Sequence, residues 1–379
     1  MDYRRTCKMK KTATITFHAA HNYGSNLQAY ALQQTLFSLG YDNKIINLRT
    51  PHQKDAYAVF TKRRGLKYIF KNLSHLLYYR ELKKAHKRFE EFINSKLVLT
   101  KEYSSCEDLM QESLDFDCYI AGSDQIWNPI PLDFDWAYYL TFVKNGKKIS
   151  YAPSFGQLAS VGDSLTTQRI ATELSKFDVI SVREQGAADN VKKMLGASPS
   201  IVLDPTLLIP KEHWLSLVEH KERIIEGDYI FFYTLFADRE RLHIVKEISK
   251  KINIPIVTSN FSNQYDVINP FIKCYDAGPL EFLTLIRDAK FVVASSFHGT
   301  VFSILLNTPF FAINGMQDAR IRTLLEIVGL EERSVSSENV SEKCEYAYDI
   351  DFMAVNQKIN EVKSPSIDYL KNSIGITHD

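Results

Sequence analysis

Cysteine motifs, long apolar runs and an excess of charge are all missing from this sequence of 379 residues. No apolar run is long enough to span a bilayer, and the basic, polar N-terminus lacks the core of a signal peptide. The net charge of +1 indicates no class of partner. The cysteines form no CxxC pair and have no histidine at ligand spacing, which argues against a zinc site and a disulfide framework. They are Cys7, Cys106, Cys118, Cys274 and Cys344. We therefore expect reduced, mostly packed cysteines in a cytosolic protein.

The beginning of the chain predicts a parallel sheet. Residues 11–19 read as a strand, 27–39 as a helix and 44–48 as a second strand, which is one β-α-β unit with a right-handed crossover. The polar turn at 22–26 follows the carboxyl end of the first strand, where such sheets bind ligands. This turn does not have the GxGxxG pattern, so a dinucleotide is not implied.

Further short apolar strands follow in two series, and each is followed by polar or turn residues. They lie at 116–121, 148–152, 179–182 and 201–203, and then at 229–235, 254–258, 291–295 and 309–313. Their alternation with helices, in a chain too long for one ordinary core, predicts an α/β fold of two Rossmann-like halves. We expect an N-terminal domain at 1–210, a C-terminal domain at 226–345, and a tail at 346–379 whose helix near 353–362 crosses back to the first domain.

The stretch 291–300 predicts an anion site. An apolar strand at 291–294 runs into small polar residues, and a buried helix is expected from 301 to 306. The loop between them presents backbone N–H groups at the positive end of a helix dipole, where His298 adds a donor or a proton. A packed strand-to-helix turn with a hydrogen-bonded histidine explains the local sequence equally well.

Residues 62–88 carry ten cations against one anion, a local charge of +9 that leaves −8 for the rest of the chain. Apolar residues interleave with the cations at helical spacing. A basic amphipathic segment at 62–90 is typical of a membrane-surface element facing anionic headgroups. Solvated surface helices packed on the sheet fit the pattern equally well. Nucleic acid is a weaker interpretation, because no recognised binding module surrounds the segment.

Six sequence blocks together resemble the polysaccharide pyruvyl transferase family, in that family's order, over about residues 13–330. They are Asn22-Tyr-Gly-Ser-Asn-Leu-Gln28, Gly122-Ser-Asp-Gln-Ile-Trp-Asn128, Ser150-Tyr-Ala-Pro-Ser154, Ser181-Val-Arg-Glu184, Asp204-Pro-Thr206 and Ser296-Phe-His-Gly299. The resemblance implies a GT-B-like architecture, with two Rossmann-like domains facing across a cleft. It also implies transfer of the enolpyruvyl group of phosphoenolpyruvate onto two hydroxyls of one sugar, which forms a cyclic pyruvate ketal.

The resemblance places the donor at His298 and Arg183. A carboxylate and a phosphate need fixed positive charge, and an arginine at a strand end can grip a carboxylate with two prongs. His298 is the expected proton donor for the enol carbon or the leaving phosphate. The alternative for Arg183 is a salt bridge to Glu184 or another neighbour. The expected donor-binding residues are Arg183, Ser295, Ser296, His298, Gly299 and Thr300. Arg320 and Arg322 would complete the phosphate grip, although a solvated helix start is the favoured interpretation.

On the acceptor side, Asp124 is the candidate for orienting or deprotonating the sugar hydroxyl, and Trp127 offers a face to the sugar ring. The alternative is that Asp124 caps a following helix and Trp127 lies in the core. The expected acceptor residues are His21, Asn22, Tyr23, Gly24, Asn26, Gln28, Ser123, Asp124, Gln125, Trp127 and Asn128. No metal or cofactor is expected, because no acidic pair is placed to bridge a metal to phosphate. Three further aspartates are interpreted as structural: Asp133, Asp135 and Asp204.

The first hypothesis is therefore a pyruvyl transferase for a bacterial capsular or exopolysaccharide repeat unit. Its acceptor would be a sugar on polyprenyl diphosphate, and the protein would be cytoplasmic with peripheral contact to the inner face of the membrane. The main alternative is a GT-B glycosyltransferase that uses a nucleotide sugar, and the third hypothesis is a non-catalytic scaffold. None of these readings involves nucleic acid.

Overall fold

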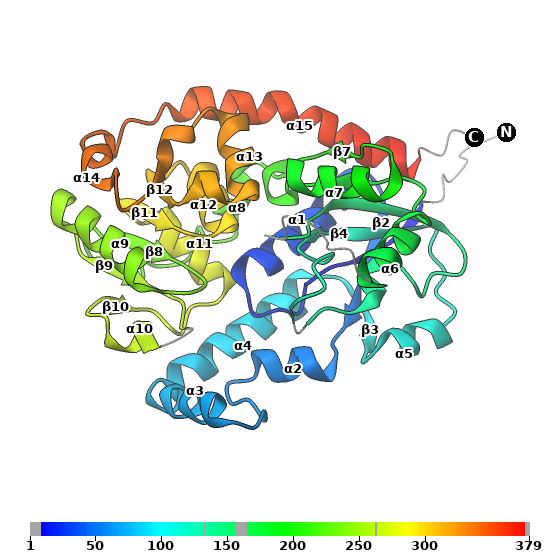
Figure 1. The fold of residues 1–379 in the computed structure, drawn as a ribbon, viewed down its shortest axis with the longest axis horizontal. Coiled ribbons are helices and arrows are strands. Elements are labelled where there is room, and N and C mark those ends of the chain that lie inside the picture. The colour runs from blue at the N-terminus through cyan, green and yellow to red at the C-terminus, as the bar shows by residue number, and fades with distance from the viewer. Residues whose placement is uncertain (1–8, 132, 157–164, 262–263, 376–379) are drawn as a thin grey trace.

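The computed structural model describes residues 9–131, 133–156, 165–261 and 264–375. Within them the chain forms two parallel sheets (Figure 1). The first has the order β3 (Leu99–Tyr103), β2 (Asp42–Leu48), β1 (Lys11–Ile15), β4 (Cys118–Asp124), β5 (Lys147–Pro153). The second has the order β10 (Ile272–Lys273), β9 (Ile256–Thr258), β8 (Ile230–Tyr233), β11 (Phe291–Ala294), β12 (Phe310–Ile313), β13 (Ser334–Val335). Every strand pair within these sheets is parallel, as the β-α-β pattern predicted.

A short parallel pair, β6 (Ser181–Val182) and β7 (Ser200–Ile201), continues the first sheet through a bridge between Ile149 and Val179. The helices of the first half are α1 (Tyr23–Ser38), α2 (Pro51–Tyr57), α3 (Leu66–Leu77), α4 (Tyr79–Lys96), α5 (Cys106–Gln111), α6 (Leu165–Leu174), α7 (Gln185–Leu195) and α8 (Lys211–Ser216). Those of the second half are α9 (Arg239–Ile252), α10 (Gln264–Ile268), α11 (Pro279–Arg287), α12 (Phe297–Leu305), α13 (Ala319–Val328), α14 (Val340–Lys343) and α15 (Phe352–Ile374). Short 3-10 turns include η1 (Trp136–Tyr139) and η2 (Pro205–Leu208).

Two helices begin earlier than the sequence predicted, and in both a polar side chain caps the first turn. Asn22 accepts a hydrogen bond from the backbone N–H of Ser25, so α1 begins at Tyr23. Ser296 accepts one from the backbone N–H of Gly299 (3.0 Å), so α12 begins at Phe297. The polar residues expected to form a loop through position 300 are therefore the first helical turn, because a capping side chain stabilises a helix start.

Helix α15 packs against both halves of the molecule and runs across the top of Figure 1. Its Ser366 hydroxyl accepts a hydrogen bond from the backbone N–H of Leu203 (3.0 Å), and its Tyr369 hydroxyl donates to the carbonyl of Ser150 (2.9 Å). The helix is longer than the predicted 353–362 and continues through Pro365. Tertiary packing of its C-terminal half, where Leu370 is buried, outweighs the local cost of the proline.

The four cysteines within the described residues are buried and unpaired: Cys106, Cys118, Cys274 and Cys344. Burial raises the pKa of Cys274 to about 11, so this thiol stays protonated at neutral pH. Cys7 lies outside the described residues. Among the helices that the structure describes, none combines the length and the apolarity needed to cross a bilayer.

If α15 joins the two halves, Leu370→Ala should lower the free energy of unfolding by about 2–5 kcal/mol, because it leaves a cavity in the core. Met353→Ala at the start of the same helix is the matched control, since Met353 is 85% exposed and its loss should change stability by less than about 0.5 kcal/mol. Urea unfolding of both variants measures this difference. Equal effects would mean that the C-terminal half of α15 adds nothing to the core.

Candidate active site

A cavity of about 510 Å³ lies where the carboxyl ends of strands from both sheets meet. Phe17 follows β1, Asp124 ends β4, Thr234 follows β8 and Ser295 follows β11, and all four line this cavity. Ligands of parallel α/β sheets bind at this edge, outside the carboxyl ends of the strands. We call this space the reaction cavity.

The N-termini of two helices reach the reaction cavity from opposite sheets. Asn22 caps α1 and Ser296 caps α12, and both residues line the cavity. The two helices approach so closely that a Cβ on Gly24 would lie 2.1 Å from Nδ1 of His298. Position 24 therefore requires glycine for the histidine to keep its place. Two helix N-termini directed at one cavity favour a bound anion.

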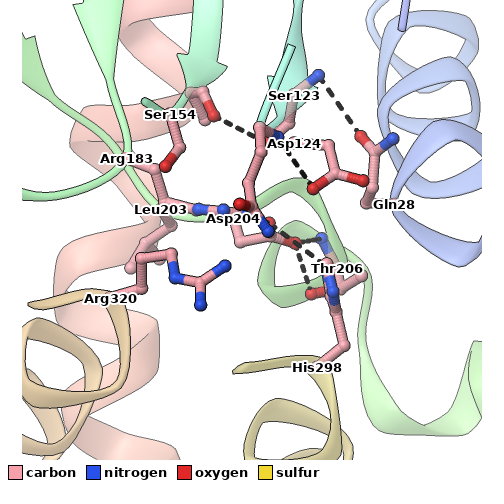
Figure 2. Close-up of polar contacts among 12 residues, drawn as sticks. Gln28, Ser123, Asp124, Ser154, Arg183, Leu203, Asp204, Thr206, His298 and Arg320 are labelled. Atoms are coloured by element: carbon pink, nitrogen blue, oxygen red, sulfur yellow. Dashed lines mark hydrogen bonds and ion pairs between the residues drawn. The ribbon is translucent and has the colours of Figure 1, made fainter. Parts of the chain in front are cut away.

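His298 belongs to a buried chain of charges (Figure 2). Its Nε2 lies 3.5 Å from Oδ2 of Asp204, and the same oxygen accepts a hydrogen bond from Nη1 of Arg183 (2.9 Å). Arg183 also lies 3.5 Å from Glu184, which accepts a hydrogen bond from the hydroxyl of Ser154 (2.7 Å). The carboxylate of Asp204 thus joins a histidine of the second half to an arginine of the first.

The charges in this chain support one another. Burial alone would raise the pKa of Asp204, but His298, Arg183 and a hydrogen bond from Thr206 hold that pKa well below its usual range. Burial lowers the pKa of Arg183, but the adjacent carboxylates outweigh it, and the net shift is upward. Burial raises the pKa of Glu184. A buried charge is stable only with a partner of opposite sign, so these residues depend on one another.

Arg183 does not line the reaction cavity. Its side chain is 2% exposed, and its guanidinium stacks 4.4 Å from the ring of Phe297. The sequence predicted a two-pronged contact between Arg183 and a carboxylate of the donor. The structure shows the salt-bridge alternative instead, with Asp204 as the main partner of Arg183. Burial prevents the direct contact, because carboxylates and an aromatic ring surround the guanidinium. In this arrangement Arg183 positions Asp204.

Two other arginines line the reaction cavity. Arg320, at the start of α13, makes a two-pronged contact with Asp318, with one nitrogen–oxygen distance of 2.9 Å. Arg241, from α9, pairs with Asp238. The solvated helix start favoured for Arg320 is incorrect, because this side chain is largely buried in the wall of the cavity. Arg322 lines a neighbouring cavity instead.

Asp124 faces the reaction cavity from the end of β4. Its Oδ2 accepts a hydrogen bond from the hydroxyl of Ser25 (2.5 Å), and its Oδ1 accepts one from the backbone N–H of Gln125 (2.8 Å). No α-helix directly follows it in the described chain, so the proposed helix-capping role does not apply. Its φ of +75° is unusual for a residue with a side chain, and such backbone strain is typical of functional sites.

The remaining acceptor candidates occupy three kinds of position. Asn22, Gln125 and Asn128 line the reaction cavity with Asp124. His21 and Tyr23 line a second cavity beside it. The others are buried behind these surfaces and support them: Gly24, Asn26, Gln28 and Ser123.

Trp127 is a core residue and not a platform for a sugar. Its side chain is fully buried and stacks on Tyr139, with ring centroids 5.8 Å apart. The expectation of a sugar-binding face at this position is therefore wrong, and the core alternative holds. The turn after β4 packs the large indole inwards, where it buries more apolar surface than an exposed position would.

The donor candidates on α12 divide in a similar way. Ser295, Ser296 and His298 line the reaction cavity, and the Ser295 hydroxyl donates to Thr234 Oγ1 (2.6 Å). Gly299 packs against Ala294 and Tyr233, which leave no room for a Cβ. Thr300 is fully buried, and its hydroxyl donates to the carbonyl of Ser296. Gly299 and Thr300 therefore shape the site from behind.

Two aspartates interpreted as structural belong to the site. Asp204 pairs with His298, and Asp133 lines the reaction cavity. The Tyr57 hydroxyl donates to Asp133 (2.7 Å), and burial raises the pKa of this carboxyl. For Asp204 a signal was present, since it directly follows an apolar strand within the block Asp204-Pro-Thr206. Asp133 lies in an irregular loop, and no local pattern singles it out.

One group of side chains in the described residues has the spacing of a metal site: His21, His86 and Glu90, with ligand atoms within 4.8 Å of one another. Arg49 donates to both oxygens of Glu90 (3.0 and 2.8 Å), and His21 lies 3.0 Å from the same carboxylate. Burial opposes ionisation of Glu90, but these partners lower its pKa to about 2. The guanidinium thus supplies the positive charge that a cation would bring.

The comparisons with known proteins agree with this geometry. The family model for polysaccharide pyruvyl transferases matches residues 22–315. The chain belongs to the polysaccharide pyruvyl transferase family. It is accordingly a transferase, and the match includes Asp124, Arg183, Asp204 and His298. A search of curated proteins found no match.

Solved structures show the same fold at low sequence identity. A UDP-GlcNAc 2-epimerase from Methanocaldococcus jannaschii is 14% identical with a TM-score of 0.52, and the match covers 93% of this chain and 99% of the epimerase. The MnaA–UDP complex from S. aureus is 12% identical with a TM-score of 0.54 and coverages of 97% and 96%. Arabidopsis thaliana UGT89C1 is 9% identical with a TM-score of 0.50 and coverages of 97% and 100%. The predicted GT-B-like fold is confirmed.

Removing the central carboxylate should destabilise the protein. Asp204→Asn leaves the Arg183 charge buried without its main partner and should lower the free energy of unfolding by about 3–5 kcal/mol. Because folding lowers the pKa of Asp204, its contribution is present above the ordinary carboxyl pKa and is lost as the pH falls below about 4. Urea unfolding between pH 7 and pH 3 should therefore show a smaller acid-dependent loss in the variant.

The exposed Asp189 on α7 provides the control, since Asp189→Asn should change stability by less than about 0.5 kcal/mol. Adding Arg183→Met to Asp204→Asn should recover part of the loss, because it removes the stranded charge. If Asp204→Asn alone were as stable as the wild type, the ion pair would not be needed to hold the site.

Proposed function

We propose that this protein transfers the enolpyruvyl group of phosphoenolpyruvate onto two hydroxyls of one sugar in a capsular or exopolysaccharide repeat unit. The observation that carries the proposal is His298, held against Asp204 at the N-terminus of α12, inside a cavity that two helix N-termini and Arg320 make favourable for anions. Phosphoenolpyruvate is a small anion with a carboxylate, a phosphate and an enol carbon that must gain a proton.

The reaction balances without a cofactor or metal. One sugar hydroxyl adds to C2 of the enol while C3 takes up a proton, so C3 becomes a methyl group. The second hydroxyl then forms a bond to C2, the bond between C2 and the phosphate oxygen breaks, and phosphate leaves with that electron pair. The two hydroxyl protons balance the proton gained by C3 and the one carried away by phosphate.

The residues of the reaction cavity fit these steps. His298 is the acid that serves C3 or the phosphate, and Asp204 orients its ring. Arg320 and the first turns of α1 and α12 bind the anionic groups of the donor. Asp124, fixed by Ser25, orients or deprotonates the attacking hydroxyl. Arg183 acts through Asp204 as a positioning residue.

We further propose that the acceptor is a sugar carried on polyprenyl diphosphate, presented at the inner face of the cell membrane. The family supports a sugar or polysaccharide acceptor. The alternative function is a GT-B glycosyltransferase that uses a nucleotide sugar, which would place a uridine nucleotide against the second sheet. The choice of donor separates the two functions directly.

Phosphoenolpyruvate should raise the melting temperature of the protein, whereas uridine diphosphate should not, because the proposed site recognises a carboxylate and a phosphate on one small molecule. Arg320→Gln should weaken this shift by removing a cation from the cavity. Arg322→Gln, on the same helix but outside the reaction cavity, is the matched control and should keep the shift. A shift with the uridine nucleotide alone would favour the glycosyltransferase.

His298→Ala should abolish phosphate release from phosphoenolpyruvate in the presence of lipid-linked sugars, a loss of about 10²-fold or more for a general acid. Stability should fall by about 1–3 kcal/mol, less than in Asp204→Asn, because Asp204 loses the imidazole but still pairs with Arg183. His220→Ala, at an exposed position, is the control for both measurements. Near-normal turnover of the His298 variant would remove the proposed acid from the mechanism.

A further inference from the structure

The outer face of α3 exposes a continuous apolar stripe. Six large apolar side chains along it are 54–74% exposed: Leu66, Ile69, Phe70, Leu73, Leu76 and Leu77. Their spacing places them on one side of the helix. Figure 1 shows α3 at the lower edge of the molecule, on the side away from α15. An apolar patch of this kind on a monomer is typical of an interaction surface.

The opposite face of α3 is anchored to the protein, so the direction of the stripe is fixed. Asn72 exchanges hydrogen bonds with Thr61 (3.1 and 3.0 Å), and His75 Nδ1 lies 2.5 Å from the carbonyl of Val59. His75 also packs edge-on against Phe261 of the second half. The apolar stripe is therefore not an inner face that has come loose from the core.

Exposed cations flank the stripe in sequence. Lys62 and Arg64 precede α3, and Arg80 and Lys83 follow it in the first turns of α4. Two other basic residues of the segment pair with carboxylates of the protein, Lys84 with Asp276 and Arg88 with Asp276 and Glu281. An apolar stripe with cations at its margin matches an anionic bilayer, whose headgroups attract the cations while the apolar side chains enter the interface.

A second cavity of about 380 Å³ lies between this helix and the reaction cavity. The two cavities share five lining residues: Asn22, Tyr57, Tyr233, Leu235 and Phe236. At its other end the second cavity is lined by Lys71 and His75 of α3. Aromatic rings make up much of its wall, as in many sugar sites: Tyr23, Tyr57, Phe89, Tyr233, Phe236, Phe261 and Tyr275.

Ser259 supplies an independent sign of a polar ligand in the second cavity. Its side chain is 4% exposed and lines the cavity, and its hydroxyl has no hydrogen-bond partner among the residues that the structure describes. A buried hydroxyl without a partner is costly, and a bound sugar hydroxyl would satisfy it.

We propose that α3 docks on an anionic membrane and that the second cavity receives the lipid-linked sugar from it and leads it to the reaction cavity. This inference rests on the proposed function for the identity of the acceptor, whereas the membrane contact stands on α3 alone. A second copy of the chain fits the stripe less well, because a symmetric contact would bring the two sets of cations together.

The membrane contact is tested by sedimentation with vesicles of phosphatidylglycerol and phosphatidylcholine. The triple variant Ile69→Ser, Phe70→Ser, Leu73→Ser should bind at least about tenfold more weakly, because it loses the inserted apolar surface. Met353→Ser, at another exposed apolar position, is the control and should bind as wild type does. Equal binding of vesicles by the triple variant and the wild type would overturn the proposal. So would a triple variant that changes from a dimer to a monomer while its vesicle binding stays the same.

The charges are tested in the same assay. Changing Lys62, Arg64, Arg80 and Lys83 to glutamate should also weaken binding about tenfold or more, and raised salt should weaken wild-type binding. Lys192→Glu with Lys193→Glu on α7 is the matched control for exposed cations elsewhere. Unchanged binding by the α3 charge variant would exclude an electrostatic contact with the membrane.

The second cavity is tested with octyl β-glucoside below its micelle concentration, observed by saturation-transfer NMR. Wild type should bind this probe, Ala85→Trp should block it by filling the cavity, and Ser259→Ala should weaken it about threefold to tenfold through loss of one hydrogen bond. Melting temperatures confirm that each variant is folded. Equal binding by wild type and folded Ala85→Trp would overturn the assignment of this cavity.

Failure of this inference differs from failure of the proposed function. His298→Ala should bind both vesicles and octyl β-glucoside as wild type does, because it changes only the reaction cavity. If wild type bound both probes through α3 and the second cavity but never released phosphate from phosphoenolpyruvate, the proposed reaction would fail and the membrane contact would stand.

Discussion

The ion pair between Asp204 and Arg183 determines the geometry of the reaction cavity. Both residues come from the first half of the chain and are almost fully buried, whereas His298, the third member, comes from the second half. Neither charge of the ion pair is stable in the interior alone, since an isolated buried charge is far more costly than a paired one. The carboxylate of Asp204 therefore sets the position of the His298 ring relative to the first sheet, and it is itself held by Arg183 and His298.

Packing enforces the same arrangement. One continuous core cluster includes Leu27 of α1, Phe282 of α11, Phe302 of α12 and Leu370 of α15, so apolar contacts run through both halves. Gly24 lets the first turn of α1 lie directly against His298. Two Rossmann-like halves that share a core in this way hold the residues of the site more precisely than two separately packed domains would, because relative motion of the halves would disturb the core.

Much of this architecture follows from sequence pattern. Alternating strands and helices predicted parallel sheets, and the polar residues that follow the strands predicted which edge carries the site. The sequence pattern does not show which way a large side chain that can bind ligands will point. Trp127 points into the core, and Arg183 pairs with two carboxylates of the protein. The interpretation of Asp204 as structural missed its role because its partners, Arg183 and His298, are 21 and 94 residues away in sequence. Local sequence carries no record of such partners.

The fold alone does not select the reaction, since epimerases and glycosyltransferases share it at 9–14% identity. The reaction must therefore be argued from the side chains at the junction of the two cavities. Tyr57 lines both cavities and holds Asp133, while Asp124 and His298 line the reaction cavity beside it. The proposed reaction needs one group that takes the proton of the sugar hydroxyl and another that gives a proton to the enol carbon. Carboxyls and an imidazole that line one cavity are the side chains that can divide this work between them.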